Sequence, residues 1–285
     1  MLQNNEYLFA EYELLEHNQV IDPASFSPLK IANNGIVFFD EVLSSSFSFF
    51  EISKFEWLLV FFRGSEFEKQ IRVVLSQGTP PKLQGSIGSA FECHKKAIDP
   101  EVVEYAQQWL SSRSLRAEDF TQTSATGFMA AIRRGFMYVS ETPGQFERAV
   151  ILHGLALAYK FVMQNISRDA SEAVNSQDKG ALLRCAELGS KFNIAFYSRY
   201  PIKLENAEIR NFWEVIEEHF QLENLNDELS RQLSAVQELI QFQISASTTQ
   251  KNQSQMIWLS IVIALGGLAI SLISTYIAHL MGWNN

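Results

Sequence analysis

Hydrophobic and polar residues follow three successive patterns along the chain, and each pattern predicts a different kind of structure. In the first quarter, the apolar residues come in short runs rich in Phe, Val, Ile and Leu, such as "SFSFFEI", "EWLLVFFRG" and "KQIRVVLSQ". Such runs, separated by turn residues, are typical of strands. Asn34-Gly35 stands between two apolar runs and predicts a hairpin turn. We therefore expect a β-rich subdomain over residues 1–78, with a mostly antiparallel sheet of about five strands in residues 6–77.

A second pattern begins after "QGTPPKLQGSIGS", whose prolines and glycines predict a linker over residues 79–95. Asp99 followed by Pro100 has the form of a helix N-cap with proline at the first helical position, and "EVVEYAQQWL" continues that helix. Further helices are predicted in "TSATGFMAAIRRGFMYV", "TPGQFERAVILHGLALAYKFVMQNI" and "DKGALLRCAELGSKFNIAFYSRY". Together they predict a helical subdomain over residues 96–200.

A stripe of apolar residues at helical spacing predicts a long helical stalk over residues 201–255. The stripe consists of Leu222, Leu225, Leu229, Leu233, Val236, Ile240 and Ile244. It suits packing against an earlier helix of the same chain as well as a coiled coil between chains. Residues 203–250 carry nine acidic and three basic side chains, which accounts for −6 of the chain's net charge of −9. Such a surface is repelled by nucleic acid and by anionic lipid.

The third pattern is a C-terminal apolar run. Residues 257–281 contain no Asp, Glu, Lys or Arg. A helix of this length spans a hydrocarbon core of roughly 30 Å. Trp258 at one end, with Tyr276 and Trp283 at the other, suits the two interfaces of a bilayer. We therefore predict a single transmembrane helix over residues 256–281. Lys251 is the basic residue nearest to it, and the positive-inside rule then places the N-terminal domain in the cytoplasm.

Small residues recur along one side of this apolar run. They are Ser260, Ala264, Gly267, Ser271, Ser274 and Ala278. Helices associate in lipid by close backbone approach, and small side chains permit that approach. We therefore expect the transmembrane helix to bind further copies of itself. The fold class predicted from all three patterns is α+β, with a β-rich subdomain, a helical subdomain, a helical stalk and one C-terminal transmembrane helix.

Residues with recognisable chemistry are few. Cys93 and His94 are adjacent, and the second cysteine, Cys185, has no histidine at ligand spacing, so we expect no metal site and two reduced thiols. No glycine-rich phosphate loop or nucleophile elbow is present, so we expect no cofactor. With no catalytic motif of this kind, we do not expect an enzyme.

One pair of residues resembles a catalytic motif. In "RAVILH", Arg148 stands five residues before His153, as in the Arg-x4-His signature of the HEPN ribonucleases. That resemblance implies that both residues take part in RNA cleavage. Ala149 stands where that family usually has a polar residue. The alternative interpretation is that His153 is a helix-packing residue in "AVILHGLALAYKFV".

The second half of the chain resembles a second family. The stretches "HGLALAYKF", "LENAEIRNFWEVIEEHF" and "LNDELSRQLSAVQELI", followed by one terminal membrane helix, are similar in order to the meiotic-nuclear-division family of membrane-anchored proteins, over residues 145–281. The resemblance implies a single-pass, self-assembling protein.

Three kinds of function remain open from the sequence. The first is a tail-anchored scaffold or assembly protein with an oligomerising stalk. The second is a membrane-disrupting effector, for example of a bacterial defence system, switched by its cytosolic module. The third is a membrane-tethered ribonuclease. We expect the first, in a bacterial inner membrane or an organellar membrane, with the lipid bilayer, other copies of the chain and an unidentified protein or ligand as partners.

Overall fold

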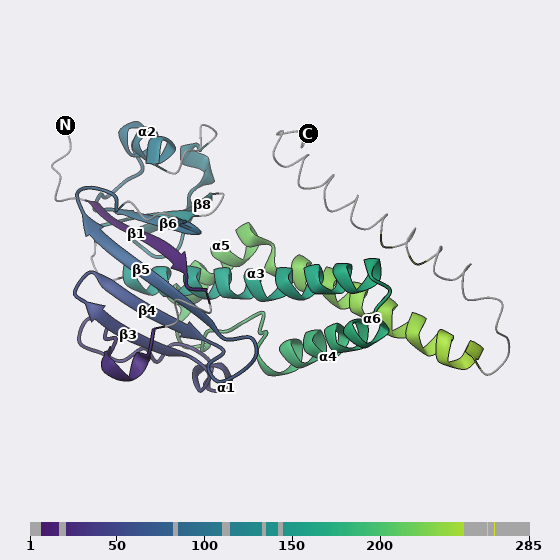
Figure 1. The fold of residues 1–285 in the computed structure, drawn as a ribbon. Helices are drawn as coiled ribbons and strands as arrows, with labels where there is room; N and C mark the ends of the chain where they lie inside the picture. The colour runs from purple at the N-terminus through teal and green to yellow at the C-terminus, as the bar shows by residue number, and fades with distance from the viewer. Residues whose placement is uncertain are drawn as a thin grey trace. The chain divides into compact units, whose positions relative to one another are not determined.

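The fold is α+β, as the sequence predicts. The structure is a computed structural model that describes residues 7–16, 21–81, 85–109, 115–132, 135–141 and 145–247, together with Ile261 and Leu265 (Figure 1). In these residues the chain forms one sheet of nine strands and six α-helices. It divides into two compact units. Unit 1 is Met1–Val162 with Phe196–Glu223, and unit 2 is Met163–Ala195 with Asn224–Asn285.

The sheet belongs to unit 1 and has the strand order β2-β3-β4-β5-β1-β6-β9-β8-β7. All neighbouring strands are antiparallel except β6 and β9, which are parallel. The strands are β1 (Tyr7–Leu14), β2 (Ser27–Pro28), β3 (Ser48–Ser53), β4 (Glu56–Phe61), β5 (Lys69–Gln77), β6 (Gly88–Cys93), β7 (Thr121–Gln122), β8 (Gly127–Ile132) and β9 (Gly135–Ser140). Strands β1 to β5 confirm the antiparallel sheet predicted for residues 6–77.

Two predicted segments were wrong. The linker predicted over residues 79–95 contains β6, which lies between β1 and β9 near the middle of the sheet. The helix predicted in "TSATGFMAAIRRGFMYV" is the hairpin of β8 and β9. All six residues of β9 are buried, so this strand is apolar on both faces. A strand of this kind has no polar alternation, and its sequence cannot be told from that of a buried helix.

The turn predicted at Asn34-Gly35 lies two residues earlier. Ile31 and Asn34 form a β-bridge, so the two central turn residues are Ala32 and Asn33, with φ angles of 49° and 65°. Positive φ at both positions is what a tight hairpin of type I′ requires. Asn33 adopts this conformation more easily than most residues because its short side chain tolerates it.

Helix α2 (Pro100–Trp109) covers one face of the sheet. It begins as predicted, with Oδ1 of Asp99 accepting a hydrogen bond of 2.8 Å from the Val102 amide. Its buried residues Val102 and Ala106 join an apolar cluster with Phe9 and Phe91 of the sheet. The N-cap and the amphipathic pattern therefore give this helix both its start and its buried side.

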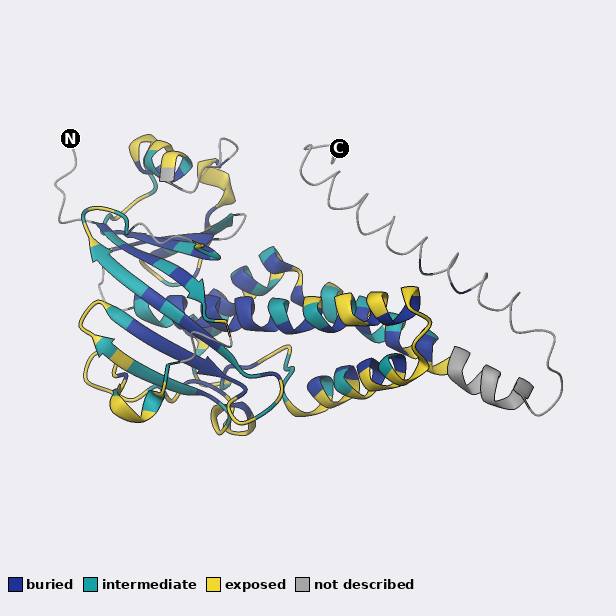
Figure 2. Cartoon of the chain, in the orientation of Figure 1, coloured by how far each residue is buried: buried dark blue, intermediate teal, exposed yellow. Residues whose placement is uncertain are grey.

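The opposite face of the sheet is covered by the first half of α3 (Phe146–Asn175) and by α5 (Ala207–Phe220). A Cβ on Gly154 of α3 would lie 2.8 Å from Cδ1 of Leu59 in β4, so the helix backbone approaches the sheet closely there. On α5, the ring of Phe212 packs edge-on against Tyr138 of β9, with 5.2 Å between ring centroids. Figure 2 shows this half of α3 as almost entirely buried.

Among the described residues, α3 is the one helix that is long and apolar enough to cross a membrane, with a mean hydropathy of 1.3 over its most apolar window. That window is 78% buried inside the structure. A buried apolar helix of this kind is typical of a protein core, since its apolar surface is already covered by protein. The apolar character of α3 is therefore explained without lipid.

Unit 2 is helical. It contains the second half of α3, α4 (Lys179–Ala195) and α6 (Leu222–Ser247) from Asn224 onward. Helices α4 and α6 touch where Gly189 lies against the side chain of Leu233. Nδ2 of Asn193 donates a hydrogen bond of 2.9 Å to Oγ of Ser230 beside this contact. Glycine at position 189 lets the two helices approach more closely than any larger residue would.

The predicted stalk is two helices rather than one. Gln221 has a left-handed conformation, with φ 52°, and its amide donates to the carbonyls of Glu217 and Glu218, which ends α5. Of the stalk stripe, Leu222, Leu229, Leu233 and Val236 are buried within the chain and Leu225 is half-buried. The side chains of Ile240 and Ile244 lie outside the described residues. The described part of the stripe thus packs inside the chain, which is the first of the two arrangements left open by the sequence.

Gly189→Leu should destabilise unit 2. Its Cβ alone would overlap Cδ1 of Leu233, and a side chain of this size needs more room than a shift of that methyl provides, so overpacking should cost about 1–3 kcal/mol. Thermal unfolding of the detergent-solubilised chain, followed by circular dichroism, measures this. Ser190→Leu, on the exposed side of the same turn, is the matched control and should change little. Equal behaviour of the two variants would contradict the helix contact.

Candidate functional site

The two residues of the ribonuclease-like pair lie in different environments. Arg148 is half-buried near the start of α3, where its Nη1 donates a hydrogen bond of 2.6 Å to Oε1 of Gln145. Nε2 of the same Gln145 donates to Oε2 of Glu208 on α5, at 2.9 Å. Arg148 therefore belongs to a polar chain that links the beginnings of α3 and α5.

His153 lies in the core, with 1% of its surface exposed. Its ring packs among the rings of Tyr12, Phe136 and Phe220, at centroid distances of 4.7, 5.3 and 5.4 Å. Neither ring nitrogen has a hydrogen-bond partner among the described residues. Burial lowers the pKa of His153 to about 3, with smaller contributions from His219 and Lys160. The imidazole is therefore neutral at physiological pH, as the helix-packing interpretation predicts.

This arrangement does not support cleavage of RNA by Arg148 and His153. A general base must come within hydrogen-bond distance of the group it deprotonates, and an enclosed imidazole has no route to a phosphodiester. A histidine with a pKa near 3 also cannot serve as the acid in neutral solution. The motif match is explained by chance spacing on a helix whose inward side includes His153.

The sheet face under α3 holds a second buried ionisable group, Glu92. This residue of β6 is completely buried, and neither carboxyl oxygen has a hydrogen-bond partner among the described residues. Burial, together with a smaller contribution from the nearby Glu147, raises the pKa of Glu92 to about 8. An isolated carboxylate is costly to bury, and the usual response is that it keeps its proton.

The groups around Glu92 come from three elements. Glu147, in the first turn of α3, has one buried carboxyl oxygen without a hydrogen-bond partner. Tyr138 is the residue of β9 paired with Glu92, and burial raises the pKa of its phenol. His94, just after β6, places Nε2 at 3.6 Å from Oε2 of Glu92, beyond hydrogen-bonding distance. The site is thus a fully buried carboxyl group on Glu92 with the half-buried carboxyl group of Glu147 nearby, and these surroundings favour a proton on Glu92 at neutral pH.

Glu92 is not among the site residues predicted from the sequence, because it lies in the segment predicted as a linker, residues 79–95. The available signal is a single acidic residue inside "SAFEC", where Phe91 and Cys93 point to the opposite face. A charged residue between apolar neighbours in a strand normally indicates a solvent-exposed face. Here α3 covers that face, which only the tertiary structure reveals.

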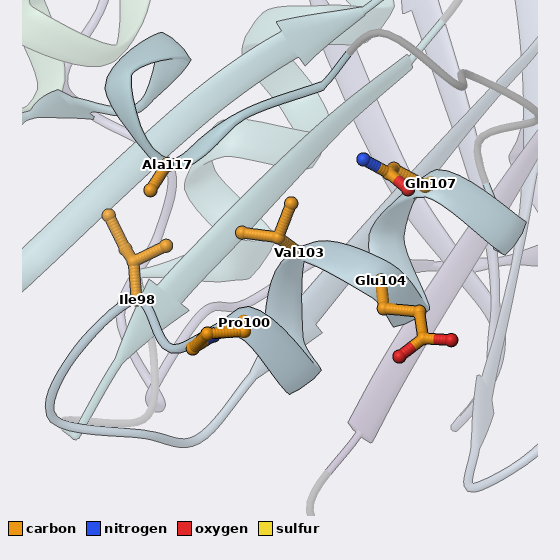
Figure 3. Close-up of a pocket in the computed structure, with 6 residues that line it drawn as sticks. All are labelled: Ile98, Pro100, Val103, Glu104, Gln107 and Ala117. Atoms are coloured by element: carbon orange, nitrogen blue, oxygen red, sulfur yellow. The ribbon is translucent and has the colours of Figure 1, made fainter.

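The surface beside α2 contains a hollow of about 630 Å³. Figure 3 shows the side chains that line it: Ile98, Pro100, Val103, Glu104, Gln107 and Ala117. The lining is mostly apolar, and Nε2 of Gln107 already donates to the Leu115 carbonyl at 2.7 Å. Glu104 is the only ionisable residue among the six, so this hollow offers no pair of groups for acid–base chemistry.

The predicted membrane segment falls largely outside the described residues. This applies to its whole small-residue stripe: Ser260, Ala264, Gly267, Ser271, Ser274 and Ala278. Ile261 and Leu265 are described, and Ile261 is buried in unit 2. Within the described part of the chain, no group of three His, Cys, Asp or Glu side chains is placed to hold a metal ion.

Comparisons with family models, with curated proteins and with solved structures found no match to this chain.

Glu92→Gln should change how stability depends on pH. Below about pH 4.5 the carboxyl holds its proton in both the folded and the unfolded chain, whereas between pH 4.5 and about 8 only the folded chain keeps it. The free energy of unfolding of the wild type therefore falls across this window, by up to about 1.4 kcal/mol per pH unit for this one group. Glutamine has no proton to release, so the variant gains on the wild type as pH rises.

Denaturant unfolding at several pH values between 4.5 and 9 measures this difference. Glu51→Gln, an exposed carboxyl on β3, is the control and should follow the wild type throughout. Parallel curves for Glu92→Gln and the wild type would show that Glu92 is not held protonated in the fold.

Proposed function

We propose that this chain is a membrane-anchored scaffold protein whose two units form an assembly module held at the bilayer by the C-terminal segment. The observation that carries the proposal is the run of residues 257–281, which contains no Asp, Glu, Lys or Arg. A segment of this length and composition is stable across a hydrocarbon core and costly to expose to water.

The packing of α3 supports the C-terminal segment as the anchor. Two parts of the chain are apolar enough to enter a membrane, and in α3 the apolar window is 78% buried by the rest of the protein. Moving α3 into lipid would expose the sheet face and break the enclosure of His153. Insertion of the C-terminal segment into the bilayer requires no such rearrangement of unit 1.

Self-association through the anchor is the second part of the proposal. The described stalk residues Leu229, Leu233 and Val236 pack within unit 2, so they do not supply a surface for a coiled coil. The small-residue stripe of the anchor remains as the feature suited to pairing between copies. The basic residue nearest to the anchor, Lys251, favours a cytoplasmic position for both units.

A switched membrane effector is the alternative, and one observation favours it. Ile261, near the start of the apolar segment, is buried in unit 2. A conformational change in unit 2 would therefore shift the start of the segment that enters the membrane. Dye release tests this alternative. An effector overexpressed in cells or added to vesicles would make the membrane leak a trapped dye, and a scaffold would not.

Removal of residues 251–285 should release the chain from membranes and leave it monomeric. Flotation with phosphatidylcholine vesicles measures the first effect, and light scattering of the detergent-solubilised protein measures the second. The full chain should float and form oligomers, while the form ending at Gln250 should do neither. Flotation of the shortened form would contradict anchoring by this segment, and an oligomeric shortened form would place self-association in the two units.

Gly267→Ile should reduce the oligomer mass in detergent, because a large side chain on the small-residue stripe separates the helices. The neighbouring Gly266 provides a matched control. On a helix it lies about 120° from the centre of the stripe, so Gly266→Ile should keep the wild-type mass. If both variants remain as oligomeric as the wild type, the stripe is not the pairing surface.

A further inference from the structure

The hollow beside α2 is lined by one side of that helix and by the segments before and after it. Four lining residues, Pro100, Val103, Glu104 and Gln107, have the spacing of residues on one side of a helix. Ile98 precedes the helix, and Ala117 follows it on the way to β7. The volume of about 630 Å³ is in the range of pockets that hold small ligands, about 300–1,000 Å³.

One part of the hollow is apolar. Ile98 and Val103 are half-buried and pack against the apolar cluster between α2 and the sheet. Pro100 and Ala117 are exposed and continue the apolar lining toward solvent. Figure 3 shows the side chains of Ile98, Val103 and Ala117 gathered on one side of the hollow. An apolar group placed against them would lose contact with water, which is favourable.

The polar groups of the hollow are acceptors. Glu104 provides a carboxylate, and Gln107 provides its Oε1, because Nε2 of Gln107 already donates to the Leu115 carbonyl. The two side chains are three residues apart on α2, so they are neighbours on the helix surface. The other four lining side chains are apolar and offer no donor. A ligand must therefore bring the donors itself.

The carboxylate of Glu104 is available for a ligand. Glu104 has no hydrogen bond or ion pair with any described residue. The neighbouring acids do have partners, since Lys95 pairs with both Asp99 and Glu101, at 2.7 and 3.5 Å. A negative charge with no partner in its own chain is suited to a cation from outside.

The start of α2 does not provide a site for an anion. The amides at the beginning of a helix attract anions, but Pro100 has no amide hydrogen. The Val102 amide already donates to Oδ1 of Asp99, whose negative charge would repel a further anion. Both ends of the lining therefore favour a positively charged ligand over a negative one.

We propose that the hollow beside α2 binds a small organic amine. The protonated amino group contacts Glu104 and Gln107, and the apolar group lies against Ile98, Val103 and Ala117. An ammonium group has three donors and one positive charge, which matches two acceptors of which one is a carboxylate. Glu104 is exposed, so the charge contact alone is weak and the apolar contact is needed for binding. This site lies entirely in unit 1 and is independent of the membrane anchor.

Titration of the full-length protein with hexylamine, in a non-ionic detergent, tests the site. The measurement is the position of the δ1-methyl signal of Ile98 in the NMR spectrum, which the variant Ile98→Val assigns. Hexanol and hexanoate are the matched ligands, since they have the same chain length with no charge and with a negative charge. Hexylamine should shift the signal with a dissociation constant several-fold lower than that of hexanol, and hexanoate should bind more weakly than either.

Glu104→Gln should weaken the binding of hexylamine several-fold and leave the binding of hexanol unchanged, because it removes only the charge. Glu101→Gln, also exposed on α2, is the matched control and should keep the wild-type affinity. An Ile98 signal that hexylamine does not move would overturn the proposal. Equal affinities for hexylamine and hexanol, or for the wild type and Glu104→Gln, would also overturn it, because the hollow would then take up apolar molecules without regard to charge.

Discussion

The close approach of α3 to the sheet is the constraint on which the rest of unit 1 depends. Gly154 lets the helix backbone come near Leu59, and the hydroxyl of Tyr12 donates to the Val150 carbonyl at 3.2 Å one turn earlier. This contact seals His153 and Glu92 away from water. It also covers the apolar side of α3, which explains why a helix of such hydropathy belongs to the core.

Sequence patterns predicted the elements whose neighbours are close in the chain. Strands β3, β4 and β5 follow one another in the sheet, and helix α2 carries its own N-cap at Asp99. The patterns failed where burial comes from distant segments. Strand β9 pairs with β6, whose residues stand 46 positions earlier (Ser89 with Gly135), and is covered on both faces, so its sequence lacks the alternation that identifies a strand.

The same limit applies to the candidate sites. His153 could be predicted as a packing residue because its helix is apolar around it, and the structure confirms that interpretation. The raised pKa of Glu92 could not be predicted, since it depends on α3 covering β6 and on the nearby Glu147. The apolar stripe of the stalk could be read from the sequence. The end of α5 at the left-handed residue Gln221 and the packing of Leu233 against Gly189 could not.

The central claim is that the C-terminal segment, and not α3, enters the lipid. Photolabelling of the full-length protein by a carbene probe held in the acyl chains of the vesicles tests it most directly. We expect label in peptides from residues 257–281 and none in peptides from α3, whose first half is covered by the sheet and α5. Label in residues 146–175 would contradict this claim, because it would place the core helix of unit 1 in the membrane.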